Sequence, residues 1–251
     1  MNERLVTDRK LLDFKVLSFD CYGTLIDWET GIWDALQPLL MQLESPLSRS
    51  DALRSFGEHE HRLESVSPDA NYRTILHDVH HALATEFGAS SSMELDEAFA
   101  HSVAHWPAFA DTAEALRELQ RHFHLVVLSN VDHASFAASA GKLGVTFDAL
   151  YLAEDIGSYK PDDANFRYLL DRVQADLQCD KSELLHTAQS LMHDHQVANR
   201  HGISNAWIDR QRLSESGDWG ATKALDTWPS FDFQFFSMRE LADAVLAEDS
   251  M

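Results

Sequence analysis

The stretch from Val16 to Asp27 constrains the fold more than any other part of the chain. It begins with a short run that favours β structure, continues with Asp20 and breaks at Gly23. Such a run is typical of a buried strand in a parallel sheet. Ligands of open α/β sheets bind in the crevice beyond the carboxyl ends of the strands. Asp20 is therefore a candidate nucleophile or metal ligand, and its alternative role is to cap the following turn.

Composition limits the possible partners. The chain has 251 residues, 45% hydrophobic and 24% charged, which allows one core and a modest second unit. A formal net charge of −21 argues against nucleic acid and anionic membranes. An anionic substrate must then be attracted by a local cationic site. The two cysteines, Cys21 and Cys179, are too few for a disulfide framework or a metal cluster, and Cys21 is expected to pack on the face opposite Asp20.

No segment predicts secretion or insertion into a membrane. Residues 1–13 form a polar lead-in that lacks the apolar core of a signal peptide. No run approaches the roughly 18 apolar residues that a membrane span needs. We therefore expect a cytoplasmic protein with no membrane partner.

The segment after the first strand is expected to be entirely helical. Residues 27–31 predict a turn that leaves the sheet, and apolar residues then recur at helical spacing in four blocks up to about residue 105. No strand-like run interrupts these blocks. The pattern predicts an all-helical unit over residues 30–106, inserted between the two parts of an α/β core, 1–29 and 107–251.

Strands and helices alternate after this insertion. Each strand is short, apolar and followed by polar residues and a helical pattern, as in a doubly wound, Rossmann-like parallel sheet. Residues 211–229 look like a loop, and a closing helix is expected over Met238–Ala247. The expected strands after the insertion lie within 124–130, 147–155 and 202–210, and the segment 184–195 lies between the last two.

Four polar motifs at the strand ends resemble those of the haloacid dehalogenase superfamily. The sequence Phe-Asp-Cys-Tyr-Gly-Thr-Leu-Ile-Asp around Asp20 is similar to its first motif, in which the first Asp forms a covalent intermediate. Ser129 and Asn130 stand at the second motif, Lys160 before a proline at the third, and Asp194 at the fourth. The resemblance spans nearly the whole chain. It implies that the helical insertion is a cap that covers the active site.

Tyr22 points to one branch of this superfamily. Its phosphatases carry a second Asp at this place, which protonates the leaving alkoxide, whereas a tyrosine resembles the type II 2-haloacid dehalogenases. An alkoxide needs a general acid near neutral pH, while a halide leaves without one. Tyrosine, with an ordinary pKa of about 10, is a poor acid for that work.

The resemblance implies hydrolysis of a small 2-haloalkanoic acid through an ester on Asp20, without metal or other cofactor. Lys160 would neutralise the nucleophile and Asp194 would help to activate water. Thr24 and Ser129 would hold the substrate carboxylate, Asn130 the halide, and an arginine of the cap would assist. The expected substrate-binding residues are Tyr22, Thr24, Trp28, Arg54, Ser129, Asn130, Gln189 and Ser190.

Some residues depart from the family pattern. Phe166 replaces a tyrosine of the dehalogenases, and Gln189 stands where phosphatases place the first of two carboxylates. His193 and His195 flank Asp194, but two residues separated by two positions on a helix do not face the same ligand. We therefore expect no histidine metal site, although one of the two could touch substrate.

Two other functions are compatible with the motifs. The first is a Mg²⁺-dependent phosphatase that would hold its ion with Asp20 and Asp194, against which Tyr22 and Gln189 both argue. The second is a catalytically weak binding protein of the same fold, which would have no need of Asp20, Lys160 and Asp194. An apolar patch on the cap helices would be compatible with a homodimer.

Overall fold

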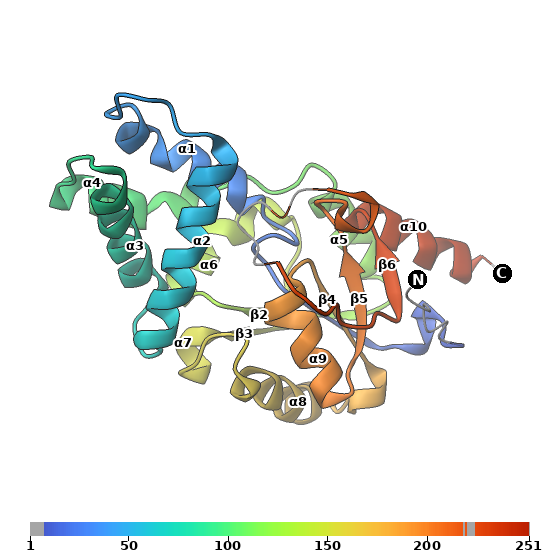
Figure 1. Cartoon of the computed structure of the whole chain (residues 1–251). Coiled ribbons are helices and arrows are strands. Elements are labelled where there is room, and N and C mark those ends of the chain that lie inside the picture. The colour runs from blue at the N-terminus through green and yellow to red at the C-terminus, as the bar shows by residue number, and fades with distance from the viewer. Residues whose placement is uncertain (1–7, 218, 220–223, 251) are drawn as a thin grey trace.

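Six short strands form one fully parallel sheet in the order β3-β2-β1-β4-β5-β6 (Figure 1). The computed structural model describes residues 8–217, 219 and 224–250, so part of the predicted lead-in and of the predicted loop 211–229 lies outside the described residues. Strand β1 is central, with Phe19 opposite Val127 of β2 and Thr187 of β4. The strands are β1 (Val16–Phe19), β2 (His124–Ser129), β3 (Ala149–Leu152), β4 (Leu184–Ala188), β5 (Ser204–Ile208) and β6 (Phe233–Phe235).

Helices alternate with the strands and cover both faces of the sheet, which confirms the predicted doubly wound α/β fold. The helices are α1 (Trp28–Leu40), α2 (Arg49–Val66), α3 (Tyr72–Phe87), α4 (Met93–Ala100), α5 (Thr112–Leu119), α6 (His133–Leu143), α7 (Ala153–Ile156), α8 (Asp163–Leu177), α9 (Gln196–His201) and α10 (Met238–Asp249). Short helical turns add η1 (Leu11–Asp13), η2 (Ser102–His105), η3 (Lys181–Glu183), η4 (Leu191–His195) and η5 (Leu213–Glu215).

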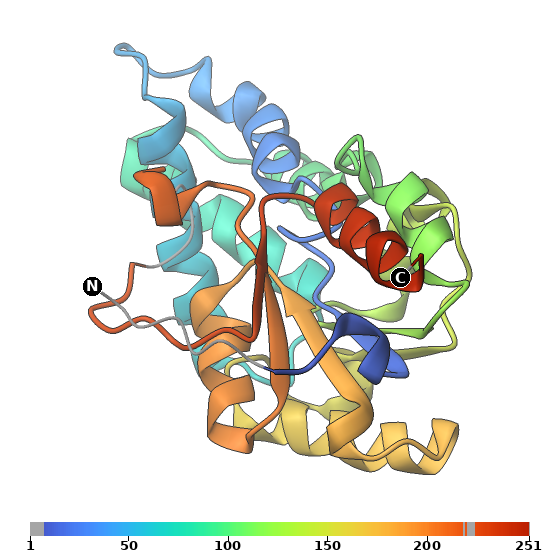
Figure 2. The same ribbon diagram turned by 90° about the vertical axis from the view of Figure 1, so that its right-hand side faces the viewer.

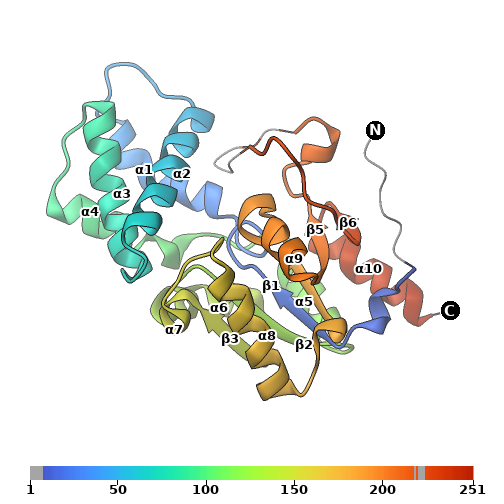
Figure 3. The same ribbon diagram turned by 60° about the horizontal axis from the view of Figure 1, so that its bottom comes forward.

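The strands are apolar on both sides because both sides are covered. In β2, Leu125 and Val127 belong to the apolar cluster that includes α5 and α10, whereas Val126 and Leu128 belong to the cluster with α8 and α9. Figure 2 shows α10 beside α5 on one side. Figure 3 brings α8 and α9 on the other side into view.

Helices α1–α4 form an insertion between β1 and β2 and lie to one side of the sheet (Figure 1). The two connections to this insertion run next to each other, because Ile26 forms a bridge with Ala108 and the Asp27 amide donates to the Pro107 carbonyl at 2.8 Å. The chain therefore leaves and re-enters the core at one place, seven residues beyond Asp20. This placement brings the insertion over the end of β1.

Two details of the sequence prediction need correction. The turn expected over residues 27–31 is the first turn of α1, because the Asp27 side chain accepts from the Thr30 amide at 3.1 Å and caps the helix. Helix α1 thus runs across the expected boundary between residues 29 and 30. Strand β6 was not predicted, since three residues are too short to show an alternating pattern. In the described part of the chain, no helix combines the length and apolarity required to cross a membrane.

Gly31 of α1 allows the insertion to pack closely against its returning connection. A Cβ atom at this position would lie 2.2 Å from Cδ1 of the buried Trp106 ring. Alanine normally stabilises a helix relative to glycine by about 0.5–1 kcal/mol. We predict that Gly31→Ala instead lowers the free energy of unfolding by about 1–3 kcal/mol, because the indole must move.

The matched control for this variant is Gly141→Ala in α6, where a Cβ would meet no atom within 4 Å. We expect this substitution to stabilise the protein by up to about 1 kcal/mol. Urea denaturation of both variants measures the difference. Equal effects of the two substitutions would contradict the close contact between Gly31 and Trp106.

Candidate active site

Asp20 lies directly beyond the carboxyl end of β1. Its amide donates to the Thr187 carbonyl of β4 at 3.1 Å, and its side chain is 9% exposed. Oδ1 accepts from Lys160 Nζ at 2.9 Å, and Oδ2 accepts from the Thr24 hydroxyl at 2.8 Å. The carboxylate is therefore fixed in orientation while one edge of the residue lines a cavity.

Lys160 reaches the same point from the loop before α8. Its ammonium is 2% exposed and donates to Asp20 Oδ1, to Asp194 Oδ1 at 2.7 Å and to the Leu128 carbonyl at 3.1 Å. The Asn130 side chain holds the backbone of this lysine at both groups: Oδ1 accepts from the Lys160 amide at 2.6 Å, and Nδ2 donates to its carbonyl at 3.0 Å. Asn130 therefore fixes where the ammonium lies.

Asp194 is positioned by Lys160 and by a second buried side chain, that of His186. It lies in the π-helical turn η4, whose type recurs at functional sites. Its Oδ1 lies 2.9 Å from Nε2 of the fully buried His186, and His186 Nδ1 lies 2.8 Å from the Ser18 hydroxyl. Asp194 Oδ2 is buried with no hydrogen-bond partner among the described residues. One oxygen of Asp194 therefore remains available to a bound molecule.

The three buried charges set one another's ionisation. Burial alone would raise the pKa of Asp194, but Lys160 and His186 outweigh it and hold that pKa well below its usual range. Burial would lower the pKa of Lys160, yet the two carboxylates raise it overall, so the ammonium stays charged. Burial and the charge of Asp194 raise the pKa of Asp20, against the effect of Lys160. Asp20 is thus the more basic carboxylate of the pair.

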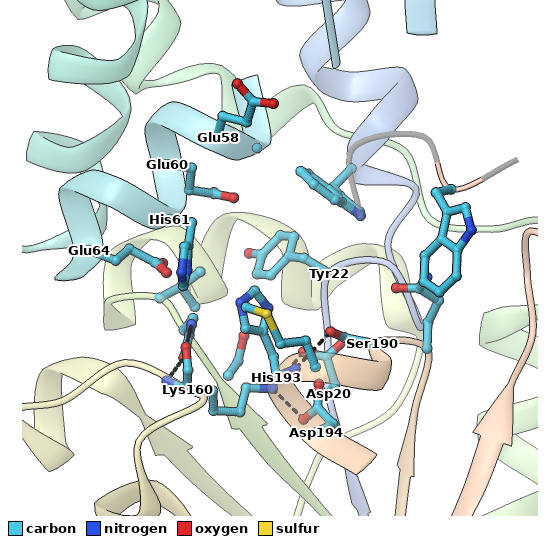
Figure 4. Close-up of a pocket in the computed structure, with 18 of the residues that line it drawn as sticks. Asp20, Tyr22, Glu58, Glu60, His61, Glu64, Lys160, Ser190, His193 and Asp194 are labelled. Atoms are coloured by element: carbon cyan, nitrogen blue, oxygen red, sulfur yellow. Dashed lines mark hydrogen bonds and ion pairs between the residues drawn. The ribbon is translucent and has the colours of Figure 1, made fainter. Parts of the chain in front are cut away.

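A cavity of about 490 Å³ separates these residues from the insertion (Figure 4). Its floor consists of residues at the strand ends, and its opposite wall comes from α2 and α3. Among the lysines and arginines that the structure describes, Lys160 and Arg54 line it. The residues that line it include Asp20, Tyr22, Trp28, Arg54, Glu60, His61, Glu64, Tyr72, Ser129, Asn130, Lys160, Gln189, Ser190, His193 and Asp194.

Thr24 does not lie at the cavity, where the sequence prediction placed it. The buried Thr24 hydroxyl donates to Asp20 and accepts from the Gln189 amide at 2.8 Å, so it orients the Asp20 carboxylate. Tyr22 does line the cavity, but its hydroxyl interacts with Ser139 and the Ser135 carbonyl of α6. Burial also raises the pKa of Tyr22, which makes it a still weaker acid.

The other predicted binding residues lie at the cavity in different roles. Ser129 is 2% exposed, and its hydroxyl has no hydrogen-bond partner among the described residues. Ser190 caps η4 by accepting from the His193 amide at 3.1 Å, and the Gln189 side chain donates to Gln211 at 2.7 Å. Ser129 is therefore the side chain whose unused hydrogen-bonding capacity points to a polar ligand.

The cationic residue expected from the cap is not available as predicted. Arg54 lies at the cavity, but its side chain is 60% exposed and bound to Asp51 at 2.6 Å. Arg62, a second arginine of α2, is exposed and interacts with His59. Among the described residues, Lys160 is therefore the buried cation that lines the cavity, and two carboxylates already share it.

Residues that sequence reasoning missed come from the insertion. Glu60 and Glu64 of α2 lie one helical turn apart and both line the cavity, and the Tyr72 hydroxyl of α3 donates to Glu60 at 2.7 Å. Burial raises the pKa of Glu60 to about 7 and that of Glu64 well above its usual range. Their spacing was visible in the sequence. It did not reveal which face of α2 would turn toward the core.

The donor set for Mg²⁺ at this site is incomplete. Mg²⁺ prefers octahedral coordination by oxygen, mostly from carboxylates and water. Here Lys160 occupies one oxygen each of Asp20 and Asp194, and Gln189 contributes no charge. His195 is turned away into the core, where its ring contacts Asn205 and the Ala188 carbonyl. These residues fit a substrate held beside an ammonium better than they fit Mg²⁺.

Comparisons with known proteins agree with this arrangement. Residues 14–186 match the family model of haloacid dehalogenase-like hydrolases. An (S)-2-haloacid dehalogenase of Pseudomonas putida is 25% identical over 215 residues, which cover 84% of this chain and 88% of that protein. An (S)-2-haloacid dehalogenase of Pseudomonas fluorescens is 26% identical over 225 residues, with the same coverage.

A solved structure shares the fold over almost the full length. The L-2-haloacid dehalogenase of Xanthobacter autotrophicus, solved with chloropropionic acid covalently bound, superposes with a TM-score of 0.73 at 17% identity. The match covers 93% of this chain and 98% of that one. At this identity the likeness establishes the fold alone.

Replacing Lys160 should lower the free energy of unfolding, because two buried carboxylates lose their counter-charge. In Lys160→Met the two aspartates would face each other without the ammonium, so we predict a loss of about 3–5 kcal/mol in the free energy of unfolding at pH 7. Urea denaturation measures this loss. It should shrink at low pH, where Asp20 becomes protonated. The control is Lys181→Met, which removes an exposed lysine that donates to the His201 carbonyl and should change stability by less than about 1 kcal/mol.

Glu60 should make the protein less stable as the pH rises. A carboxyl whose pKa is raised by folding holds its proton more tightly in the folded state, so stability falls between about pH 4.5 and about pH 7. We predict that Glu60→Gln, which can still accept from Tyr72, is more stable than the parent protein at pH 8, by up to about 3 kcal/mol, and equal to it at pH 4. Glu97→Gln on the exposed face of α4 should show no such pH dependence. A gain of equal size at both pH values would contradict the raised pKa.

Proposed function

The chain belongs to the haloacid dehalogenase-like hydrolases, and we propose that it hydrolyses the carbon–halogen bond of a small 2-haloalkanoic acid. The observation that supports this most directly is the setting of Asp20. Its carboxylate lies at the floor of a cavity, oriented by Thr24 and neutralised by Lys160, with no acid contributed by Tyr22. Such a group is suited to attack carbon and displace a leaving group that can depart as an anion.

The first chemical step is displacement at C2. Asp20 forms a bond to this carbon from the side of the sheet, and the carbon–halogen bond breaks on the opposite side, which inverts the configuration. The product is an ester of Asp20. Lys160 stabilises the carboxylate before the attack, and Ser129 donates from the cavity floor to the substrate carboxylate.

The second step is hydrolysis of the ester. Water attacks the carboxyl carbon of Asp20, which releases the hydroxy acid and restores the nucleophile. Asp194 is ionised, and its Oδ2 has no partner among the described residues, so it can accept a proton from that water. His186 and Lys160 hold Asp194 in place for this role.

Halide release tests this proposal against a Mg²⁺-dependent phosphatase. We expect the protein to release chloride from one enantiomer of 2-chloropropionate in the presence of EDTA, since no step requires a metal ion. An aryl phosphate supplied with Mg²⁺ should give no phosphate. Phosphate release that depends on Mg²⁺, without chloride release, would overturn the proposal.

Asp20→Asn tests the nucleophile. The amide cannot form the ester, so chloride release should fall by about three orders of magnitude or more, while the unfolding transition is retained. Asp171→Asn, which changes an exposed aspartate of α8 outside the cavity, should leave the rate unchanged. Undiminished chloride release by Asp20→Asn would assign the attack to another group.

A further inference from the structure

The wall of the cavity that faces Asp20 is acidic, which is unexpected for a site that takes an anion. Glu60 and Glu64 both point into the cavity from α2 (Figure 4). Glu64 is 6% exposed. The same cavity contains the buried hydroxyl of Ser129, which has no hydrogen-bond partner among the described residues and indicates, independently of the two acids, a place for a polar ligand.

The charge balance requires that these acids be neutral when substrate binds. Asp20 and Asp194 already outnumber Lys160, and two further carboxylates would repel the carboxylate of the substrate. Burial raises the pKa of both glutamates, and the charge of Glu60 raises the pKa of Glu64 further. A neutral carboxylic acid is a hydrogen-bond donor, which a carboxylate is not. The wall therefore presents proton donors.

In the proposed displacement, the halogen departs in the direction of this wall. A bond to C2 formed by Asp20 from the sheet requires the leaving group to depart on the far side of that carbon. Helix α2 lies on the far side of the cavity from the strand ends. The halogen therefore leaves toward the insertion, where the acidic side chains are, and away from Lys160.

Glu64 is the better placed of the two acids. Lys160 and Asn130 both lower its pKa against the effect of burial, so it lies near these two residues at the floor of the cavity. Glu60 already accepts from the Tyr72 hydroxyl. Glu64 is buried and lines the cavity, so its proton can face the substrate.

We propose that Glu64 donates its proton to the departing halogen, and that the site consequently accepts substrates with a poor halide leaving group, 2-fluoroalkanoic acids above all. This proposal rests on the dehalogenase function proposed above. As the bond from Asp20 to C2 forms, the carbon–fluorine bond breaks and fluoride takes the proton of Glu64, which becomes a carboxylate. Hydrolysis of the ester then consumes one water and yields the hydroxy acid and one proton, which restores Glu64.

Fluoride is the halide for which such a donor matters most. It is the most basic halide and the strongest hydrogen-bond acceptor among them, whereas bromide departs readily as a bare anion. General acid catalysis typically contributes about 10²–10⁴-fold in rate. Loss of the acid should therefore slow the release of fluoride much more than the release of bromide.

The experiment compares 2-fluoro-, 2-chloro- and 2-bromopropionate with the parent protein, Glu64→Gln and Glu97→Gln, and measures the released halide. Glutamine matches the shape of glutamate and removes a buried acid, so the fold should be retained. We expect Glu64→Gln to lose at least about 100-fold in fluoride release and less than about threefold in bromide release. Glu97→Gln, on an exposed part of α4, should match the parent protein with all three.

A second variant keeps the test decisive if Glu64→Gln does not fold. Glu64→Asp retains an acid but withdraws it by one methylene, and should also lose fluoride release selectively. Equal losses for all three halides would show that Glu64 has only a structural role, and undiminished fluoride release would exclude it as the donor.

The behaviour of the parent protein separates the two proposals. Bromide release without any fluoride release would overturn the role of Glu64 and leave the dehalogenase function intact. No release of any halide would overturn both. Fluoride release that depends on Glu64 would support both.

Discussion

The ammonium of Lys160 between Asp20 and Asp194 is the interaction on which the site depends. The three groups come from the loop before α8, the end of β1 and the turn η4, so they join segments far apart in the sequence. Removing such charges from water costs more free energy than their attraction usually returns. Stability alone therefore does not explain the arrangement, whose direct effect is to fix the orientation of the Asp20 carboxylate at the edge of the sheet.

The central position of β1 explains how a few residues at the strand ends can form the floor of the cavity. Parallel strands end at one edge of a sheet, so the residues that follow β1, β2 and β4 meet there. This topology alone brings together Asp20 and Gln189, which stand immediately beyond β1 and β4, and Ser129, which is the last residue of β2. The helical insertion begins directly after this point, and it closes the cavity over the same three positions.

The sequence predicted the residues of this edge because their positions depend on local structure. A buried strand and the polar residue at its end are adjacent in the chain, so Asp20 and Ser129 could be named, whereas Asp194, six residues beyond β4, was named from the resemblance. The wall of the cavity could not be predicted in this way. Glu60 and Glu64 are two of the four acids of α2, and only the packing of this helix over the sheet places them at the cavity. The hydrogen bond from the Thr24 hydroxyl to Asp20 could not be predicted either, because it depends on a side-chain conformation that the sequence does not show.

Burying the two glutamates of the cavity wall lowers the stability of the folded protein. An acid held with a raised pKa makes the folded state less stable at neutral pH than a glutamine of the same shape would. Natural sequences tend to retain such unfavourable groups where function needs them. Asp20 and Asp194 form ion pairs with the buried Lys160, whereas no ion pair of Glu60 or Glu64 is found among the described residues and Glu60 is bound to the phenol of Tyr72. Their neutral form, which can give a proton, is therefore the state that the fold favours.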